Sequence, residues 1–506
     1  MQLPKYIVEM LARIQSVAPG KVKIGVVGTI RKVFDYELGL KQFAALKLAL
    51  ATHSNIELVN VDEVTEHGDG VIWAGQISVT NKVASKLLFE GVDGLIIMPV
   101  NYGDEESAAE LARRVVDAIG CPVATFVHHE APIHKDGKRD LDDGCGILPM
   151  RKEMAKRMGR VPFYIRKSPI DTEKFRKSLF GFLQVCAGVR ALHSVRGVQI
   201  GADQPTFYGI QTSKDGTQAM FNMRFETFDS ADFQKMLVEG LANPPEWFGE
   251  VLDWIKSKID YSEVEKDFPD TASLTALALG YVLEILVAKE SNAVSINCWA
   301  SIQENLRFMV CGVNALLFEL GIMAPCETDW GGALANAVLQ GVALGMENPV
   351  GCFMDLTRFD EETGKSLFWH CGEGAPCLVC GECKAKQGWI IPTTRGCAGL
   401  LNGKVGNVGD KVTFLQLRSG INGYPRFIAF NGAIVDGDDT IGTHFYVQVS
   451  DPEAFEDWMA QVLPLHHHSI MLGANLLPAI RKISEWTGIV LDEYDELTKR
   501  VTKCVL

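Results

Sequence analysis

Residues 92–129, VDGLIIMPVNYGDEESAAELARRVVDAIGCPVATFVHH, hold the clearest alternation of strand and helix patterns in the chain. The segment begins and ends with apolar runs, 92–100 and 122–129, of the kind found in strands that are buried on both faces. Between these runs, residues 104–120 carry apolar residues at helical spacing after an acidic start, and acidic residues offset the positive end of a helix dipole. A strand, a helix and a second strand in this order predict a parallel βαβ unit.

The same alternation extends toward the N-terminus. Residues 21–28 (KVKIGVVG) have a strand pattern, residues 36–50 (YELGLKQFAALKLAL) have helical spacing, and residues 56–61 (IELVNV) are again strand-like. We therefore expect a first doubly wound α/β domain over residues 1–165, with ligands binding at the carboxyl ends of its strands.

Two further domains are expected after this one. Residues 166–355 contain long helical patterns and the short strand patterns VRGVQIG (195–201) and AVSINCW (293–299), which indicate a second doubly wound α/β domain. Residues 356–506 carry β-branched and aromatic residues between glycine-rich turns, which predict a β-rich C-terminal domain. The predicted fold class is α/β, with two N-terminal doubly wound domains followed by this β-rich domain.

The bulk composition limits the class of protein and its partners. The 506 residues are 47% hydrophobic and 22% charged, which is typical of a globular protein of about three domains. The net charge of −14 and the pI near 5.4 disfavour nucleic acid and anionic membranes as partners. The 13 cysteines are scattered, and MQLPKYIVEM at the start lacks the apolar region of a secretory signal, so we expect a cytoplasmic protein with reduced thiols. The apolar residues 274–288 include Glu284, and we expect a buried helix there rather than a membrane span.

Acidic residues stand at two places where a cleft is expected. Residues 324–340 (APCETDWGGALANAVLQ) place Glu327 and Asp329 before a helix of small residues, and helix capping is the simplest role for Asp329. Asp355 closes the apolar run NPVGCFMDL and is expected at the carboxyl end of a buried strand. Two carboxylates with one or two histidines suit Mn²⁺ or Mg²⁺, while zinc stays open from residue types alone.

A family resemblance adds to this pattern. Residues 296–340, from INCWASIQ to LANAVLQ, followed by GCFMDL (351–356) and FWHCGEGAP (368–376), resemble the core of the L-fucose isomerase and L-arabinose isomerase superfamily. The resemblance lies in a C-E-x-D motif before a helix, an acid on the next strand and then a histidine. Softer similarity covers most of the chain, including HHHSIML at 466–472.

The resemblance implies a divalent metal held by two acids and a histidine. Carried onto this sequence, the ligands are Glu327, Asp355 and one histidine of 466–468, for which we choose His467. His370 matches a position that is a ligand in the arabinose branch, so we expect either a fourth ligand or a substrate contact there. The alternative for His370 is a histidine satisfied within a core turn. The implied ion is Mn²⁺, or another divalent cation such as Mg²⁺ or Co²⁺.

The implied activity is aldose–ketose isomerisation, an intramolecular oxidation and reduction in carbohydrate metabolism that passes through an enediol. Glu327 and Asp355 would serve both as metal ligands and as the acid and base that move a proton between two sugar carbons. The resemblance also implies a homo-oligomer, a trimer or hexamer, in which the N-terminal domain of a neighbouring subunit contacts the substrate. A non-catalytic sugar-binding or regulatory protein with the same fold is the alternative, and the identity of the sugar is left open.

Five residues are candidate substrate contacts for a monosaccharide. Arg31 follows the first predicted strand, where it would meet an anionic group, although a solvated surface position is the simpler role. The others are His129 in a polar loop, Trp330 after the acidic motif, His468 and His444. A loop position exposed to solvent is the alternative for His129, and packing within a strand is the alternative for His444.

A cysteine-rich insertion departs from the family pattern. Cys377, Cys380 and Cys383 are spaced C-x2-C-x2-C directly after the HCGEGAP motif. Such spacing can bind a structural Zn²⁺ or a cluster if Cys371 or Cys397 supplies a fourth ligand. Plain buried or loop cysteines are the alternative.

Overall fold

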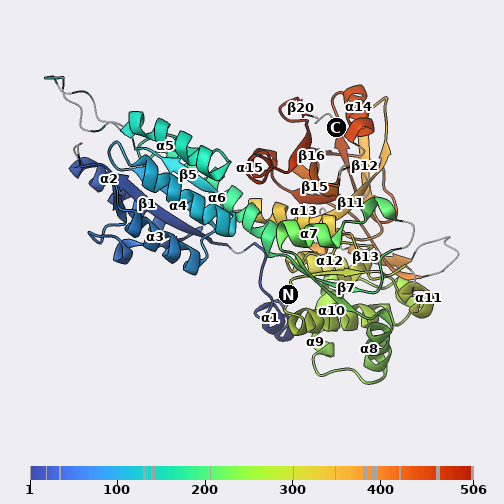
Figure 1. Ribbon diagram of the computed structural model, residues 1–506. Coiled ribbons are helices and arrows are strands. Elements are labelled where there is room, and N and C mark those ends of the chain that lie inside the picture. The colour runs from blue at the N-terminus through green and yellow to red at the C-terminus, as the bar shows by residue number, and fades with distance from the viewer. Residues whose placement is uncertain are drawn as a thin grey trace. The chain divides into compact units, whose positions relative to one another are not determined.

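The computed structural model divides the chain into two compact units (Figure 1). The N-terminal unit comprises residues 18–190 together with Glu485–Thr487, and the main unit comprises residues 1–17, 191–484 and 488–506. The residues that the structure describes are 2–18, 20–32, 36–128, 133, 135–137, 141, 143–204, 207–299, 301–347, 349–379, 385–389, 397–420, 423–462 and 468–502.

The N-terminal unit is built on a parallel sheet of six strands. The strand order is β2-β1-β4-β5-β6, and β3 also pairs with β1, in line with β2. The strands are β1 (Val22–Ile30), β2 (Ile56–Val59), β3 (Val71–Trp73), β4 (Gly94–Pro99), β5 (Val123–Phe126) and β6 (Phe163–Ile165). The helices are α2 (Glu37–Ala51), α3 (Ile77–Glu90), α4 (Glu105–Ile119), α5 (Asp143–Met158) and α6 (Glu173–Ser194), which runs on into the main unit.

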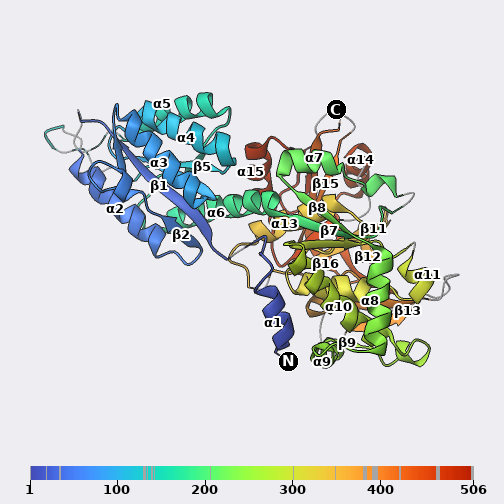
Figure 2. The same ribbon diagram turned by 60° about the horizontal axis from the view of Figure 1, so that its bottom comes forward.

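Helices cover both faces of this sheet, as the alternating pattern predicts. Figure 2 shows α3, α4 and α5 on one face and α2 on the other, which follows from right-handed crossovers that run in opposite directions from β1. The predicted βαβ unit at 92–129 is β4-α4-β5. Its helix begins at the Asp104 cap, which accepts the amide of Ser107, and ends at Gly120 with a φ of 68°.

The main unit contains a smaller parallel sheet with the order β10-β7-β8. Its strands are β7 (Arg196–Ile200), β8 (Arg224–Phe228) and β10 (Ala293–Ile296). The segment from Met323 to Cys326 forms parallel bridges to β10 and extends the sheet by one position. The helices of this part are α1 (Lys5–Leu11), α7 (Lys214–Phe221), α8 (Ser230–Ala242), α9 (Phe248–Lys258), α10 (Thr271–Ala288), α11 (Ile302–Leu306), α12 (Cys311–Glu319) and α13 (Trp330–Val342).

The described residues include one helix, α10, that is long and apolar enough to cross a membrane. Its apolar window is 72% buried inside the protein, and Tyr6 of α1 donates to the Gly280 carbonyl oxygen on its surface at 3.0 Å. The helix lies in the core of the main unit, which confirms the expectation of a buried helix.

The β-rich part contains six antiparallel strands that close on themselves. They follow the order β16-β15-β18-β11-β12-β17, and β17 pairs back to β16. These strands are β11 (Gly351–Phe359), β12 (Lys365–His370), β15 (Lys411–Ser419), β16 (Pro425–Val435), β17 (Thr443–Gln448) and β18 (His468–Leu472). Around them lie β9 (Ile259–Asp260), β13 (Ala385–Trp389), β14 (Ala398–Lys404), β19 (Val490–Asp495), β20 (Arg500–Thr502), α14 (Pro452–Val462) and α15 (Leu477–Thr487). Short 3-10 helices occur at Asp62–Val64, Tyr208–Ile210, Val264–Lys266 and Pro376–Leu378.

Stacked phenylalanines fill the interior of this barrel. Phe414 and Phe430 stack with ring centroids 3.7 Å apart, and Phe368 lies 4.3 Å from Phe414 and 5.6 Å from Phe445. Burying such rings contributes about 1.5–3 kcal/mol each. The aromatic core therefore stabilises the closed barrel and the positions of the side chains on its strands.

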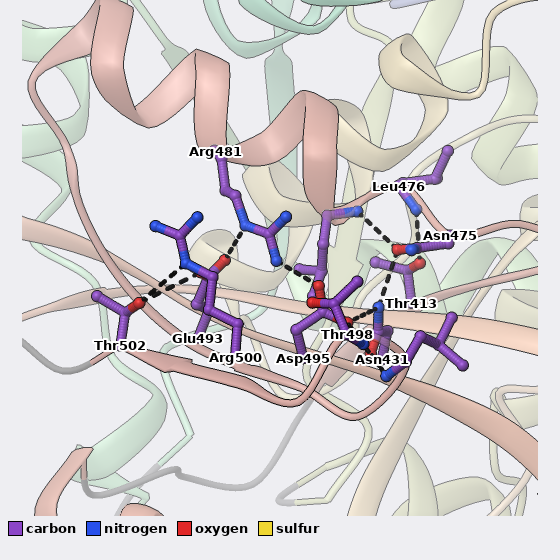
Figure 3. A network of polar contacts seen from close by, with 12 residues as sticks. Thr413, Asn431, Asn475, Leu476, Arg481, Glu493, Asp495, Thr498, Arg500 and Thr502 are labelled. Carbon is purple, nitrogen blue, oxygen red and sulfur yellow. Dashed lines mark hydrogen bonds and ion pairs between the residues drawn. The ribbon is translucent and has the colours of Figure 1, made fainter.

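A buried polar network fastens α15 to the barrel (Figure 3). Arg481 of α15 ion-pairs with Glu493 at 2.5 Å and with Asp495, both on β19 and both almost fully buried. Burial by itself raises the pKa of Asp495, but hydrogen bonds from Thr498, Arg481 and Asn431 outweigh it and hold that pKa below its usual value. The buried carboxylates of Glu493 and Asp495 are thus compensated by the positive charge of Arg481, as buried charges require.

The observed architecture confirms a mixed α/β fold with parallel sheets in the N-terminal part and a β-rich C-terminal part. The division into three domains at residues 165 and 355 stays a prediction, since the two compact units follow other boundaries.

Candidate functional site

The candidate site lies at the carboxyl ends of the small parallel sheet of the main unit. Glu327 directly follows Cys326, which bridges the last residue of β10, Ile296. Trp299 leaves the same strand three residues after Ile296. Functional groups gather at such strand ends because the loops that follow them converge there.

The backbone around Glu327 is held in an unfavourable conformation. Glu327 and Thr328 have φ angles of 48° and 62°, in the left-handed region that residues with a Cβ avoid. Glu327 is only 5% exposed, and its Oε1 accepts the indole N–H of Trp299 at 2.9 Å. Strain of this kind persists where surrounding structure enforces it and is concentrated at functional sites.

Three potential metal ligands meet at this point. The side-chain ligand atoms of Cys326, Glu327 and His370 all lie within 4.8 Å of one another, and all three residues are buried. His370 is the last residue of β12, is 3% exposed, and has its ring 6.1 Å from that of Phe353. A thiol, a carboxylate and an imidazole form a donor set that fits a divalent ion. The structure thus brings together two of the predicted ligands, Glu327 and His370.

Further thiols surround the three ligands. Hydrogen bonds from Cys326 and from Gln303, whose Nε2 lies 3.2 Å from the sulfur, lower the pKa of Cys298. The bond to Cys298, burial and the nearby Glu327 carboxylate raise the pKa of Cys326 well above its usual value. The raised pKa of Cys326 belongs to the protein without a cation beside the thiol, since a divalent ion bound to a thiol lowers its pKa.

Asp355 lies in the middle of β11 and not at its end as expected from the sequence, because the strand continues to Phe359. It is half-buried and shares its strand face with Phe353. A Cβ added at Gly332, on α13, would lie 2.5 Å from the Phe353 ring, so this face of β11 packs toward α13. Asp355 is therefore on the side of the barrel that faces the helix following Glu327.

The C-terminal histidines are only partly covered by the described residues. His466 and His467 lie outside them, as does His129. The backbone of His468 begins β18 and pairs with Met354, the residue before Asp355. The roles given to these histidines stay predictions.

Asp329 is the N-cap of α13, as predicted. Its Oδ1 accepts the Gly332 amide at 2.9 Å, and the carboxylate also receives a two-point ion pair from the buried Arg418 at 2.9 and 2.7 Å. The fully buried charge is thereby compensated, and the start of α13 is fixed against β15.

Trp330 anchors the site against β7 and also borders a cavity. Its indole N–H donates to Oε1 of Gln199 at 3.0 Å, and only 1% of the residue is exposed. The cavity has a volume of about 190 Å³ and adjoins Glu327 through Thr328. Its lining residues are Asp203, Gln211, Thr212, Ser213, Lys214, Asp215, Thr328 and Trp330.

His444 is packed within β17 beside Trp369 of β12. Its Nδ1 lies 3.2 Å from the Gly442 carbonyl oxygen, and its Nε2 lies 4.0 Å from Asp439 Oδ1. Burial lowers the pKa of His444, which therefore favours the neutral ring. His444 does not belong to the cluster of potential ligands formed by Cys326, Glu327 and His370.

Arg31 lies at the carboxyl end of β1 in the N-terminal unit. Its Nε donates to the Gly103 carbonyl oxygen at 2.8 Å, its Nη2 lies 3.4 Å from Glu105, and its guanidinium stacks over the Tyr102 ring at 5.3 Å. The side chain is thus held by partners within its own unit, and a substrate role for it stays a prediction.

The cysteine insertion is described only at its first member. Cys377 is exposed, and its amide donates to Glu319 at 2.9 Å, whereas Cys380 and Cys383 lie outside the described residues. Cys371 lies 3.4 Å from Cys311, sulfur to sulfur, and Cys397 donates to the Gln303 carbonyl oxygen at 3.4 Å. A structural metal at Cys377 stays a prediction.

Sequence reasoning missed three residues near the site. Cys326 stands inside the C-E-x-D motif, and Trp299 follows a predicted strand, so both carried a local signal. Glu373, in HCGEGAP, is fully buried and accepts from Asn314 Nδ2 at 2.5 Å. Its burial and partner come from packing between α12 and the loop after β12, which local patterns do not specify.

Residues 25–193 match the family model described as the fucose/sulfoquinovose isomerase N-terminal domain. This range covers nearly the whole of the N-terminal unit and stops before the site residues of the main unit.

Relatives extend the similarity into the main unit. A sulfoquinovose isomerase of Alkalicoccus urumqiensis is 25% identical over 407 residues, covering 80% of this chain and 86% of the relative. One from Priestia aryabhattai is 24% identical over 289 residues, which cover 55% of this chain and 60% of the relative. A third, from Clostridium sp. (strain MSTE9), is 23% identical over 329 residues, covering 63% of this chain and 69% of the relative.

Proposed function

Because the chain is a member of the fucose isomerase-like superfamily, we propose that it is a metal-dependent aldose–ketose isomerase of a monosaccharide. The observation that carries the proposal is the meeting of Glu327, a strained and buried acid, with His370 from the barrel. Two groups from distant parts of the chain converge on one point, in a cluster whose donors suit a divalent ion.

The proposed metal ligands are Glu327, Asp355, His467 and His370, with Mn²⁺ as the first ion to test and Mg²⁺ or Co²⁺ as alternatives. When bound, such an ion polarises a carbonyl group and stabilises negative charge on the substrate oxygens. Support for Asp355 comes from its strand face, which packs toward α13. Support for His467 comes from its place directly before β18, the strand that pairs with β11.

Glu327 and Asp355 are proposed to move the proton. One carboxylate removes it from the carbon next to the carbonyl group, and the other returns it to the neighbouring carbon of the enediol. Trp299 fixes the orientation of the Glu327 carboxylate through the 2.9 Å bond to Oε1. A base held in one orientation meets the substrate without having to reorganise.

The substrate is proposed to be a monosaccharide that carries an anionic group. The relatives are named sulfoquinovose isomerases, which makes sulfoquinovose the first sugar to test. The cavity beside Thr328 has polar walls that suit sugar hydroxyls, and its Lys214 is paired with Asp203 at 2.8 Å. The further contacts proposed are Trp330, His444, His468, His129 and Arg31. A cytoplasmic homo-oligomer, a trimer or hexamer in which a neighbouring subunit supplies some of these contacts, is part of the proposal.

The test is ketose formation from sulfoquinovose, fucose and arabinose by metal-stripped and Mn²⁺-loaded protein. We expect turnover only with the ion, and loss of turnover in Glu327→Gln with the thermal midpoint retained. Glu284→Gln is the matched control, because Glu284 also accepts a tryptophan indole N–H, from Trp247 at 3.0 Å, on α10. It should keep full activity.

The alternative of a non-catalytic sugar-binding protein gives a different result. Sugar affinity would then be indifferent to the ion and to Glu327→Gln, and no ketose would form under any condition. That outcome would reject the isomerase.

A further inference from the structure

We propose that the thiol of Cys326 is a ligand of the metal at this site, and that the site therefore prefers a borderline ion such as Zn²⁺ or Co²⁺ over Mn²⁺. The inference rests on the proposed metal site. It concerns a residue that lies outside the expected set of two acids and histidines, and it changes which ion is expected.

The geometry points to the thiol. The sulfur of Cys326 lies within 4.8 Å of the ligand atoms of both Glu327 and His370. Zinc binds sulfur at about 2.3 Å and nitrogen or carboxylate oxygen at about 2.0–2.2 Å, so tetrahedral ligand atoms lie about 3.5 Å apart. Side-chain adjustments of about 1 Å bring the three atoms to this separation.

The thiol is held toward this point by the backbone on both sides. On its N-terminal side, Cys326 is bridged to Ile296 at the end of β10. On its C-terminal side, the left-handed conformations of Glu327 and Thr328 turn the chain sharply. Successive residues of an extended chain point to opposite faces, and this turn allows Cys326 and Glu327 to present ligand atoms to one place.

The burial of this cluster distinguishes it from the groups of acidic residues that occur by chance on protein surfaces. Cys326 is 1% exposed, Glu327 5% and His370 3%. An ion held there is shielded from water, and binding of the ion releases the proton of the thiol to solvent. Neighbouring groups also orient the sulfur, since Cys326 shares a hydrogen bond with Cys298, which itself accepts from Gln303 at 3.2 Å.

The chemical types of the ligand atoms determine which ion is preferred. Carboxylate oxygens alone suit the hard ions Mg²⁺ and Mn²⁺, whereas thiolate and imidazole ligands favour zinc and cobalt. Affinity rises from Mn²⁺ to Co²⁺ at almost any site. The informative quantity is therefore how much the ratio of the two affinities falls when the sulfur is removed.

Cobalt provides a direct test with the full-length protein. Co²⁺ added to metal-stripped protein should give a sulfur-to-cobalt charge-transfer band in the near ultraviolet. The band should be absent from Cys326→Ser, and the ratio of Co²⁺ to Mn²⁺ affinity should fall about tenfold or more in that variant. Cys121→Ser is the matched control, because Cys121 is a buried cysteine of the N-terminal unit and its loss should leave the band unchanged.

Two results would overturn the inference. One is stoichiometric Co²⁺ binding to the wild-type protein without the band, which would leave only oxygen and nitrogen ligands. The other is a band that keeps its full intensity in Cys326→Ser, because the sulfur would then come from another thiol, such as Cys298, Cys371 or the cysteine insertion.

A second measurement does not depend on the variant folding. X-ray absorption at the zinc edge of the wild-type protein should show a sulfur neighbour at about 2.3 Å, and its absence would reject the ligand. The band and the sulfur neighbour are independent of turnover. A protein that loses the band in Cys326→Ser and forms no ketose would reject the isomerase and keep Cys326 as a ligand. A protein that forms the ketose and shows neither the band nor the sulfur neighbour would reject only the ligand.

Discussion

At the scale of single residues, the site depends on how Glu327 is held. A buried carboxylate in a left-handed backbone conformation costs free energy of order 1–3 kcal/mol, which the rest of the fold must offset. Trp299 contributes through its hydrogen bond to Oε1 while remaining 38% exposed itself. Because Trp299 is partly exposed and bonded to the proposed base, we expect its main role to be the orientation of that carboxylate and not the packing of the core.

We predict that Trp299→Phe lowers kcat about tenfold while KM changes little. A hydrogen bond to a charged group contributes about 1.5–3 kcal/mol, and about 1.4 kcal/mol in a barrier corresponds to a factor of ten in rate. Steady-state kinetics on the ion-loaded protein measures the effect.

Trp247→Phe is the control for this substitution. The indole of Trp247 donates to Glu284 at 3.0 Å, so the variant removes the same kind of bond from a place without a proposed catalytic role. Equal losses of kcat in the two variants would contradict the role given to Trp299.

His444 should make stability depend on pH. Burial lowers its pKa below the value of about 6.5 of an unperturbed histidine, and Lys404 adds to this effect while the Gly442 carbonyl and Asp439 oppose it. A lowered pKa in the folded state means that the stability this group contributes is present above about pH 6.5 and is lost as the pH falls through the lowered value. The denaturant midpoint of the wild-type protein should therefore fall more steeply between about pH 7 and pH 5 than that of His444→Gln. If the denaturant midpoints of the two proteins fell equally with pH, His444 would not be a source of the pH dependence.

At the scale of secondary-structure elements, the site is aligned by packing between α13 and β7. Trp330, the first residue of α13, lies against Gly197, where an added Cβ would be 2.3 Å from the indole ring. Asp329 and Arg418 fix the same helix end from the side of β15. The backbone of Glu327 is thus held by contacts that its own segment does not make.

We predict that Gly197→Ala destabilises the main unit by about 1–3 kcal/mol and lowers activity, because the methyl group displaces Trp330 and with it the start of α13. Chemical denaturation and turnover are the two measurements. Gly249→Ala on α9 is the control, since no atom lies within 4 Å of the Cβ position there. Alanine in that helix should be neutral or stabilising by up to about 1 kcal/mol. Unchanged stability in Gly197→Ala would show that β7 does not position the helix.

At the scale of the whole molecule, the two compact units do not follow the chain in order. The N-terminal unit takes in Glu485–Thr487 from the end of α15. Trp486 is 2% exposed, donates to the Gly120 carbonyl oxygen at 2.9 Å, and has its ring 5.4 Å from that of Phe163. The stability of residues 18–190 therefore includes a side chain from near the C-terminus.

We predict that Trp486→Ala destabilises the N-terminal unit by about 3–5 kcal/mol, because a large buried ring is lost. Hydrogen exchange should become faster in β4 and β5 and stay unchanged in the barrel. Trp458→Ala is the control, since Trp458 is 2% exposed on α14 and packs in the barrel core. In that variant, hydrogen exchange should become faster in the barrel and stay unchanged in β4 and β5. Unaltered exchange in β4 and β5 of Trp486→Ala would contradict this assignment.

The predictable part of the fold was its local part. The β4-α4-β5 unit, the buried helix α10 and the Asp329 cap follow from periodicity and capping over a few residues, and each is found in the structure. The sequence predicts the closed barrel only as a β-rich region, since the pairing of β16 with β17 depends on contacts between distant segments. The end of the apolar run predicts a strand end at Asp355, yet the ladder to β12 continues past it.

For the site, the order of residues in the chain was enough to select Glu327 and His370 as partners, through the resemblance of their motifs. Their approach to within 4.8 Å, and the presence of Cys326 beside them, are properties of the folded chain. Periodicity and capping act between neighbours and are written into short segments. The direction in which a side chain points from a strained turn, and the strand end that it meets, result from the packing of a sheet, a helix and a barrel whose residues are far apart in the chain.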